Sequence, residues 1–297
     1  MKGGVAMAKQ FANKGKSQGS NGMVMRKGTK ILSYFLLITM TIIVLYPLLW
    51  LLFTALKTQK ELTFNTWGLP KEPQFINFSR AWTRSRMGNF MVNSIFASAI
   101  TVVLTLVSCV PLAFVLSRFE FRFKRLLYFV VISGMMIPIN SAIIPLYILA
   151  NNLNMMNNLS ALGLIYGAFR IPISVFILEG FMNTIPKELE ECAHIDGCSI
   201  FKMFWNIAIP LSRDTIVTIS ILAVLNSWNE LMVAMLLLSR QTVKTLPIGL
   251  MGFISEYSAE YTQLCAGILI AIIPNIIFYI FAQEKIQKGM TAGAIKG

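Results

Sequence analysis

Long uncharged apolar runs constrain this chain more than any other feature of its sequence. The first extends from Ile31 to Leu56 without a charged residue. About 20 apolar residues suffice for a helix to cross the hydrocarbon core of a bilayer, and a soluble fold needs no runs of this length. Only 13% of the 297 residues are charged, against about 25% in soluble domains. The sequence therefore predicts an all-α integral membrane protein.

Six such runs can be recognised along the chain. We expect transmembrane helices at roughly 31–56, 90–117, 126–150, 161–182, 211–238 and 262–283. The weak alternation that is typical of a transmembrane β-barrel is absent. The predicted organisation is a basic, disordered cytoplasmic tail over 1–30, a six-helix domain over 31–285 and a cytoplasmic C-terminal tail over 286–297.

The distribution of positive charge indicates the orientation of the chain. The net charge is +13, and the basic residues lie mainly at the ends of apolar spans instead of being interleaved with aromatic residues. Nucleic-acid binding is therefore disfavoured. With the N-terminus inside, the inner segments carry 17 basic residues and the outer segments eight, which predicts that both termini are cytoplasmic. Three arginines in the first outer segment, Arg80, Arg84 and Arg86, oppose this bias unless that segment is folded.

Few residues of this sequence are of the types that bind metals, form disulfides or catalyse reactions. The four cysteines contain no CxxC pair, and His194 is the only histidine, so metal and disulfide sites are disfavoured. A nucleophile with an adjacent base is not evident either. We therefore expect no catalytic residue, no metal site and no cofactor on this chain.

A polar island interrupts the apolar pattern between the fourth and fifth spans. Pro186 and the acidic residues at 188, 190 and 191 are typical of a helix start, and Gly197 lies where that helix would end. A second short helix is expected at about 199–206, before Pro210. A helix lying on lipid headgroups is one reading, but such helices favour basic polar faces. A protein partner with a matching groove fits this acidic helix better.

The same island carries a family resemblance. Glu191-Cys192-Ala193-x-x-x-Gly197, followed after nine residues by Ile207-x-Ile209-Pro210, resembles the EAA loop of binding-protein-dependent ABC importer permeases. Cys192 replaces the first alanine of the consensus, and Ile209 stands where leucine is commoner.

Other motifs resemble the carbohydrate-uptake branch of that family, specifically the shorter permease of maltose-type systems. They are Asn93-Ser94, Ser117-Arg118-Phe119, Ile144-Pro145-Leu146, Pro186-Lys187-Glu188-Leu189-Glu190-Glu191, Trp228-Asn229-Glu230 and the ending Thr291-Ala292-Gly293-Ala294-Ile295-Lys296-Gly297. The resemblance extends over about 75–297.

The resemblance implies a mechanism and a set of partners. The loop over 184–210 would dock as a coupling helix in a cleft of a dimeric cytoplasmic ATPase, which binds ATP-Mg, while this chain forms half of a sugar or oligosaccharide pathway. A homologous second permease and an extracytoplasmic solute-binding protein complete the importer in the bacterial cell membrane. The residues expected to couple to the ATPase are Glu188, Glu191, Cys192, Ala193, Asp196, Gly197, Ile207 and Pro210.

Polar residues inside the spans are candidates for the substrate pathway, because ionisable groups in the membrane usually face a cavity or a partner. Asn226, Asn229 and Glu230 offer groups suited to sugar hydroxyls, and Trp228 has a ring that stacks on a pyranose. The asparagines are equally consistent with hydrogen bonds between helices.

Arg170 leaves three readings open: an acidic partner, an anionic substrate such as a glycerol phosphate or acidic sugar, or a long stem reaching the surface. A stand-alone secondary transporter is a further alternative, which predicts inverted repeats. No such repeat is evident in the sequence.

Overall fold

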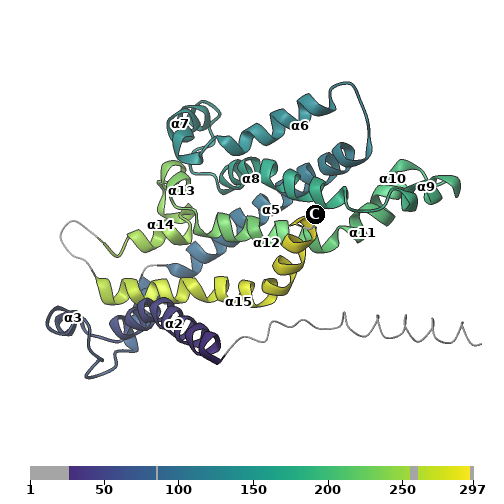
Figure 1. Cartoon of the computed structure of the whole chain (residues 1–297). Helices are drawn as coiled ribbons and strands as arrows, with labels where there is room; N and C mark the ends of the chain where they lie inside the picture. Colours follow the sequence, from purple (N-terminus) through teal and green to yellow (C-terminus); the bar gives the residue numbers. More distant parts are fainter. Residues whose placement is uncertain (1–26, 85, 255–259, 295–297) are drawn as a thin grey trace, which may run out of the picture. The chain divides into compact units, whose positions relative to one another are not determined.

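The computed structural model describes residues 27–84, 86–254 and 260–294, which form helices joined by short loops (Figure 1). The chain divides into two compact units, residues 1–50 and 51–297. Helix α2 (Lys27–Ala55) provides the described part of the first unit and continues into the start of the second. Most of the predicted tail over 1–30 lies outside the described residues.

The described helices confirm the predicted class. Four are long and apolar enough to cross a membrane: α2, α5 (Met87–Arg118), α8 (Leu159–Met182) and α15 (Tyr261–Ala294). Two bent helix pairs raise the number of candidate spans in the described part of the chain to six when each pair counts as one. Helix α15 runs on through 286–294, the described part of the predicted C-terminal tail.

The third predicted span is not one continuous helix. Helix α6 (Lys124–Ser133) and the short turn η1 (Gly134–Met136) meet η2 (Ile139–Ala142) and α7 (Ile143–Asn152) at a bend of 88°. The cause is Pro138, which has no backbone N–H and pushes the residue before it out of the helical region. Ile137 accordingly has φ −89° and ψ 104°.

The fifth predicted span, over 211–238, is also interrupted. Helix α12 (Arg213–Asn229) ends at Glu230, which is extended, and α13 (Met232–Leu237) begins two residues later. Before α12, the short helices α10 (Ile200–Met203), η3 (Phe204–Ala208) and α11 (Ile209–Leu211) meet it at 72°. The turn η4 (Gln241–Val243) and α14 (Leu246–Met251) complete this region.

Helices α5 and α8 form the centre of the second unit and pack closely along their length (Figure 1). Gly163 and Gly167 face α5, and a Cβ added to Gly163 would lie 2.8 Å from the carbonyl oxygen of Ala97. The hydroxyl of Thr101 donates to the carbonyl of Gly163 at 3.2 Å across the interface. Small residues four apart allow this close approach, as in many membrane helix pairs.

Helix α12 packs against α5 and α8, and α15 packs against α12. The hydroxyl of Ser227 in α12 donates to that of Ser98 in α5 at 2.8 Å. The motif residues Asn93 and Ser94 join α5 to the segment before α14: the Asn93 amide donates to the carbonyls of Thr242 and Lys244, and the Ser94 hydroxyl accepts from the Leu246 amide.

The first predicted outer segment is folded. It contains α3 (Gln59–Phe64) and α4 (Ile76–Arg84). The ammonium group of buried Lys57 donates to the carbonyls of Asn65 and Thr66, and the Asn77 amide donates to those of Ala55 and Lys57, each at 2.8 Å. These contacts give the segment a folded backbone. The sequence required such a fold if Arg80, Arg84 and Arg86 were to lie outside against the bias of positive charge.

Candidate functional site

The polar island folds as the short helix α9 (Glu188–Ile195), close to the predicted bounds. Glu188 and Glu191 lie in its first turn, where carboxylates favour the positive end of the helix dipole. Gly197 ends it with φ +77°. The amide of Cys198 donates to the carbonyl of Ala193, and that of Gly197 to the carbonyl of His194. This Schellman arrangement uses the left-handed conformation that the sequence predicted for Gly197.

Most predicted coupling residues lie on the surface. Glu188, Glu191, Cys192, Asp196, Gly197 and Pro210 are exposed, whereas Ala193 and Ile207 are partly buried. Ile195, beside them, is 84% exposed. In the described structure α9 therefore presents acidic and apolar side chains together, with Ala193 nearer the protein.

An ion pair connects α9 to the end of α5. The Arg118 Nε atom lies 2.6 Å from Glu190 Oε1, and the two side chains are 5% and 14% exposed. The Arg118 guanidinium also donates to the carbonyl of Ile185 at 3.3 Å, just before α9. Neither residue was predicted as a site residue. The available signal was an arginine ending an apolar span together with a distant run of acids, but sequence spacing does not pair residues 72 positions apart.

The second half of the loop connects α9 to α12. The Ser199 hydroxyl caps α10 by accepting from the Lys202 amide. Phe204–Ala208 then form a π-helical turn that contains Ile207, and Pro210 lies at the start of α11. One short helical segment therefore connects the end of α9 to α12, which it meets at the 72° bend.

A polar cluster lies at the contact of α8 and α12. Arg170, Asn226 and Glu230 line one cavity of about 20 Å³ together with Tyr166, a volume that admits about one water molecule. Arg170 is half-buried and forms no ion pair with a described residue. The structure thus brings together three of the five predicted pathway residues.

Glu230 stabilises the break between α12 and α13. Its two carboxylate oxygens accept from the amides of Val233 at 2.9 Å and Ala234 at 3.1 Å. The hydroxyl of Tyr166 in α8 donates to the same carboxylate. The side chain therefore acts as an N-terminal cap for α13 and ties that helix to α8.

Trp228 and Asn229 lie away from that cluster. Trp228 is 3% exposed and belongs to a hydrophobic core with Phe90 and Leu246. The Asn229 side chain accepts from Asn275 of α15 at 3.2 Å and donates to the carbonyl of Leu225. Both residues line a second cavity of about 200 Å³ beside α14 and α15. Their described contacts are structural.

Comparison with known proteins gives the family. The model of the family described as "Binding-protein-dependent transport system inner membrane component" matches residues 109–289. The chain belongs to this family. The match includes the whole polar island and both bent regions of the chain.

Relatives over nearly the full length confirm the resemblance to carbohydrate-uptake permeases. A protein of Caldicellulosiruptor sp. (strain Rt8B.4), named as ABC transporter permease protein ORF2, is 41% identical over 91% of this chain and 98% of its own length. The sulfoquinovosyl glycerol transport system permease protein SmoH of Agrobacterium fabrum is 31% identical over 85% of this chain and 89% of its own length. Members of this family are transporter components, so the chain is a multi-pass membrane subunit of an ABC importer.

A solved structure supports the fold. In a bacterial ABC transporter involved in the import of the acidic polysaccharide alginate, one chain superposes with a TM-score of 0.76 at 24% identity, covering 86% of this chain and 95% of that chain. At this identity the likeness concerns the arrangement of helices only.

Proposed function

We propose that this chain forms half of the translocation pathway of an ATP-driven saccharide importer and transmits ATPase movements through the segment 184–210. The chain carries no catalytic site or cofactor of its own; ATP-Mg binds the partner ATPase. The other partners are a homologous second permease and an extracytoplasmic solute-binding protein. Both termini face the cytoplasm, since basic residues concentrate on that side.

One observation carries this proposal: α9 is exposed, yet its first turn is held against α5. The Arg118–Glu190 pair holds its start on α5, and the Gly197 turn directs the chain into α10. An exposed helix with rigid connections to two spans transmits a displacement, whereas a mobile loop absorbs it. The ATPase supplies the differential affinity for two arrangements of the permease, and the spans are the bistable element.

Affinity purification tests the proposal. The tagged chain would be isolated from its native membrane in mild detergent, and ATPase activity would be assayed in the eluate. Activity should accompany the wild type and Gly180→Ala, and be lost with Gly197→Arg, which places a bulky residue at φ +77° on the exposed turn. An inert chain that purifies alone, with uptake persisting in cells lacking the ATPase, would instead favour a secondary transporter.

Arg170 supports a second candidate, in which the transported solute is anionic. Its side chain lies near the middle of α8 without an ion-pair partner among the described residues. A charge at that depth is costly unless it faces a cavity or ligand. One of the similar proteins, SmoH, is named for such a solute, sulfoquinovosyl glycerol.

Uptake assays with an acidic and a neutral disaccharide distinguish the two candidates. Arg170→Gln should lower uptake of an acidic disaccharide more than that of its neutral counterpart if the guanidinium binds the substrate's negative charge. Equal losses for both sugars would assign Arg170 a structural role and leave the neutral saccharide as the favoured substrate.

A further inference from the structure

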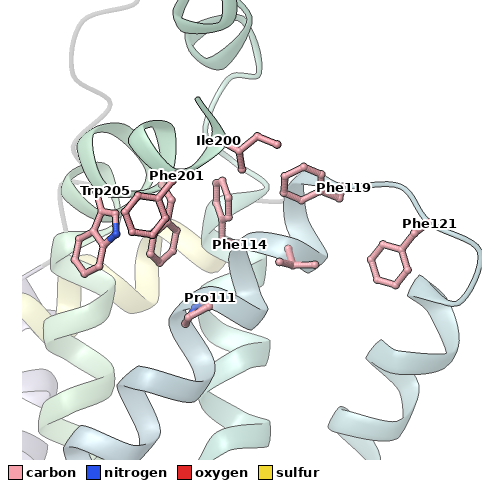
Figure 2. Close-up of a pocket in the computed structure, with 9 residues that line it drawn as sticks. Pro111, Phe114, Phe119, Phe121, Ile200, Phe201 and Trp205 are labelled. Atoms are coloured by element: carbon pink, nitrogen blue, oxygen red, sulfur yellow. The ribbon is translucent and has the colours of Figure 1, made fainter. Parts of the chain in front are cut away.

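A large apolar groove lies where the end of α5 meets α10 and η3 (Figure 2). Its volume is about 830 Å³, within the ~300–1,000 Å³ typical of small-molecule sites. All nine residues that line it are apolar. None of the coupling residues of α9 takes part, so the groove is a surface separate from the acidic helix.

Aromatic contacts build the groove in advance of any ligand. The Phe114 ring lies 5.8 Å from that of Phe119 and 5.1 Å from that of Phe204. Trp205 contacts the rings of Phe204 and Phe201 at centroid distances of 5.4 and 6.2 Å. Phe201 and Trp205 nevertheless remain 71% and 52% exposed. Figure 2 shows the rings of Trp205, Phe201, Phe114 and Phe119 in sequence from left to right, with that of Phe121 set apart from them.

The groove lies at the end of a membrane span. Val115 of its lining is three residues before Arg118, the last residue of α5. Because the apolar span ends in arginine, we expect this end of α5 near the depth at which acyl chains meet headgroups, where tryptophan is enriched. Covering such an apolar surface is favourable in proportion to its area, and acyl chains are the apolar material present at this depth.

Positive charge borders the groove on two sides. Lys202 is exposed and lines a shallower depression of about 460 Å³ with Phe201 and Trp205. On the other side, exposed Arg122 follows Phe121 of the lining and lies 5.6 Å from the Phe123 ring. Neither cation forms an ion pair with a described residue. Apolar walls with cations at the rim match a lipid that has apolar chains and an anionic headgroup.

We propose that the groove binds one acyl chain of an anionic phospholipid, with the lipid phosphate near Lys202. This inference rests on the proposed function in one respect, since the cytoplasmic orientation places the groove in the leaflet where anionic lipids meet basic segments. A chain in the groove contacts both α5 and η3. It therefore stabilises the segment that connects α9 to α12 against α5.

Fluorescence quenching by brominated lipids tests the proposal, because Trp205 lines the groove. The full chain would be reconstituted in vesicles of brominated phosphatidylglycerol or brominated phosphatidylcholine, and the Trp205 signal taken as the difference between wild type and Trp205→Phe. Phosphatidylglycerol should quench at about fivefold lower mole fraction, the preference expected from one lysine near the phosphate. Raising the salt concentration should reduce this preference.

Two lysine variants make the result specific. Lys202→Ala should abolish the preference for phosphatidylglycerol, whereas Lys187→Ala should retain it, because Lys187 is exposed on the same loop but lines neither depression. Equal quenching by both lipids in the wild type overturns the anionic headgroup. Absence of Trp205 quenching by either lipid would overturn the proposal that an acyl chain occupies the groove, since protein would then cover it. ATPase co-purification, measured on the same preparations, reports separately on the proposed function.

Discussion

Gly197 has the backbone conformation on which the end of α9 depends. Its φ is +77°, and an added Cβ would meet no atom within 4 Å, so the cost of a side chain there is backbone strain alone. For alanine this cost is about 1–2 kcal/mol. Gly197→Ala should therefore speed hydrogen exchange at the Cys198 amide, which donates to Ala193, by about 5- to 30-fold.

Gly180 provides the matched control for this prediction. An added Cβ there also meets no atom within 4 Å, but Gly180 lies in α8 with an ordinary helical φ. Gly180→Ala should leave exchange at Cys198 unchanged. Similar exchange rates in Gly197→Ala and wild type would contradict the strained turn.

Gly163 is constrained by packing instead. An added Cβ would lie 2.7 Å from Ile100 Cβ and 2.8 Å from the Ala97 carbonyl oxygen. Because α5 backbone cannot move aside without disturbing the whole interface, Gly163→Ala should destabilise the protein by about 1–3 kcal/mol. A lower thermal midpoint in detergent than that of Gly180→Ala is the expected result, and equal midpoints would refute the close approach of α5 and α8.

At the scale of elements, side-chain hydrogen bonds explain the break in the fifth span. Glu230 accepts from two amides of α13 and from Tyr166. Glu230→Ala should cost about 1–2 kcal/mol, as for the loss of a helix cap, and Glu230→Gln should cost less because its amide oxygen still accepts. Thermal unfolding of both variants, with and without Tyr166→Phe, checks this. Additive effects of the two positions would rule out the shared hydrogen bond.

The sequence predicted elements better than their interruptions. Apolar runs located the spans, and the turn at Gly197 followed from its place after an acidic helix. The bend at Pro138 has a visible local cause. The break at Glu230 does not, because Met232–Leu237 is apolar and continues the pattern. The Glu230 carboxylate that caps α13 is also held by Tyr166, 64 positions away, and sequence spacing does not reveal that contact. The core position of Trp228 likewise depends on packing that spacing does not reveal.

At the scale of the whole second unit, the Arg118–Glu190 pair joins the loop to the central helix pair. Both side chains are largely buried, so removing one partner leaves a charge without compensation and costs about 3–5 kcal/mol. Glu190→Ala should lower both the thermal midpoint and ATPase activity that depends on the permease. The exchanged double variant Arg118→Glu/Glu190→Arg should recover part of both; failure to recover either would argue against the pair.

We propose that α9 contacts the ATPase and moves with its nucleotide cycle. Cys192 provides a native probe, since it is exposed on α9 while Cys109 and Cys265 are buried. In a Cys198→Ser background, a short bifunctional maleimide should cross-link Cys192 to a cysteine placed in the cleft of the co-purified ATPase. The yield should change when ATP is added. Absence of a cross-link between Cys192 and the ATPase cysteine would contradict this contact. A yield that is the same with and without ATP would contradict the movement.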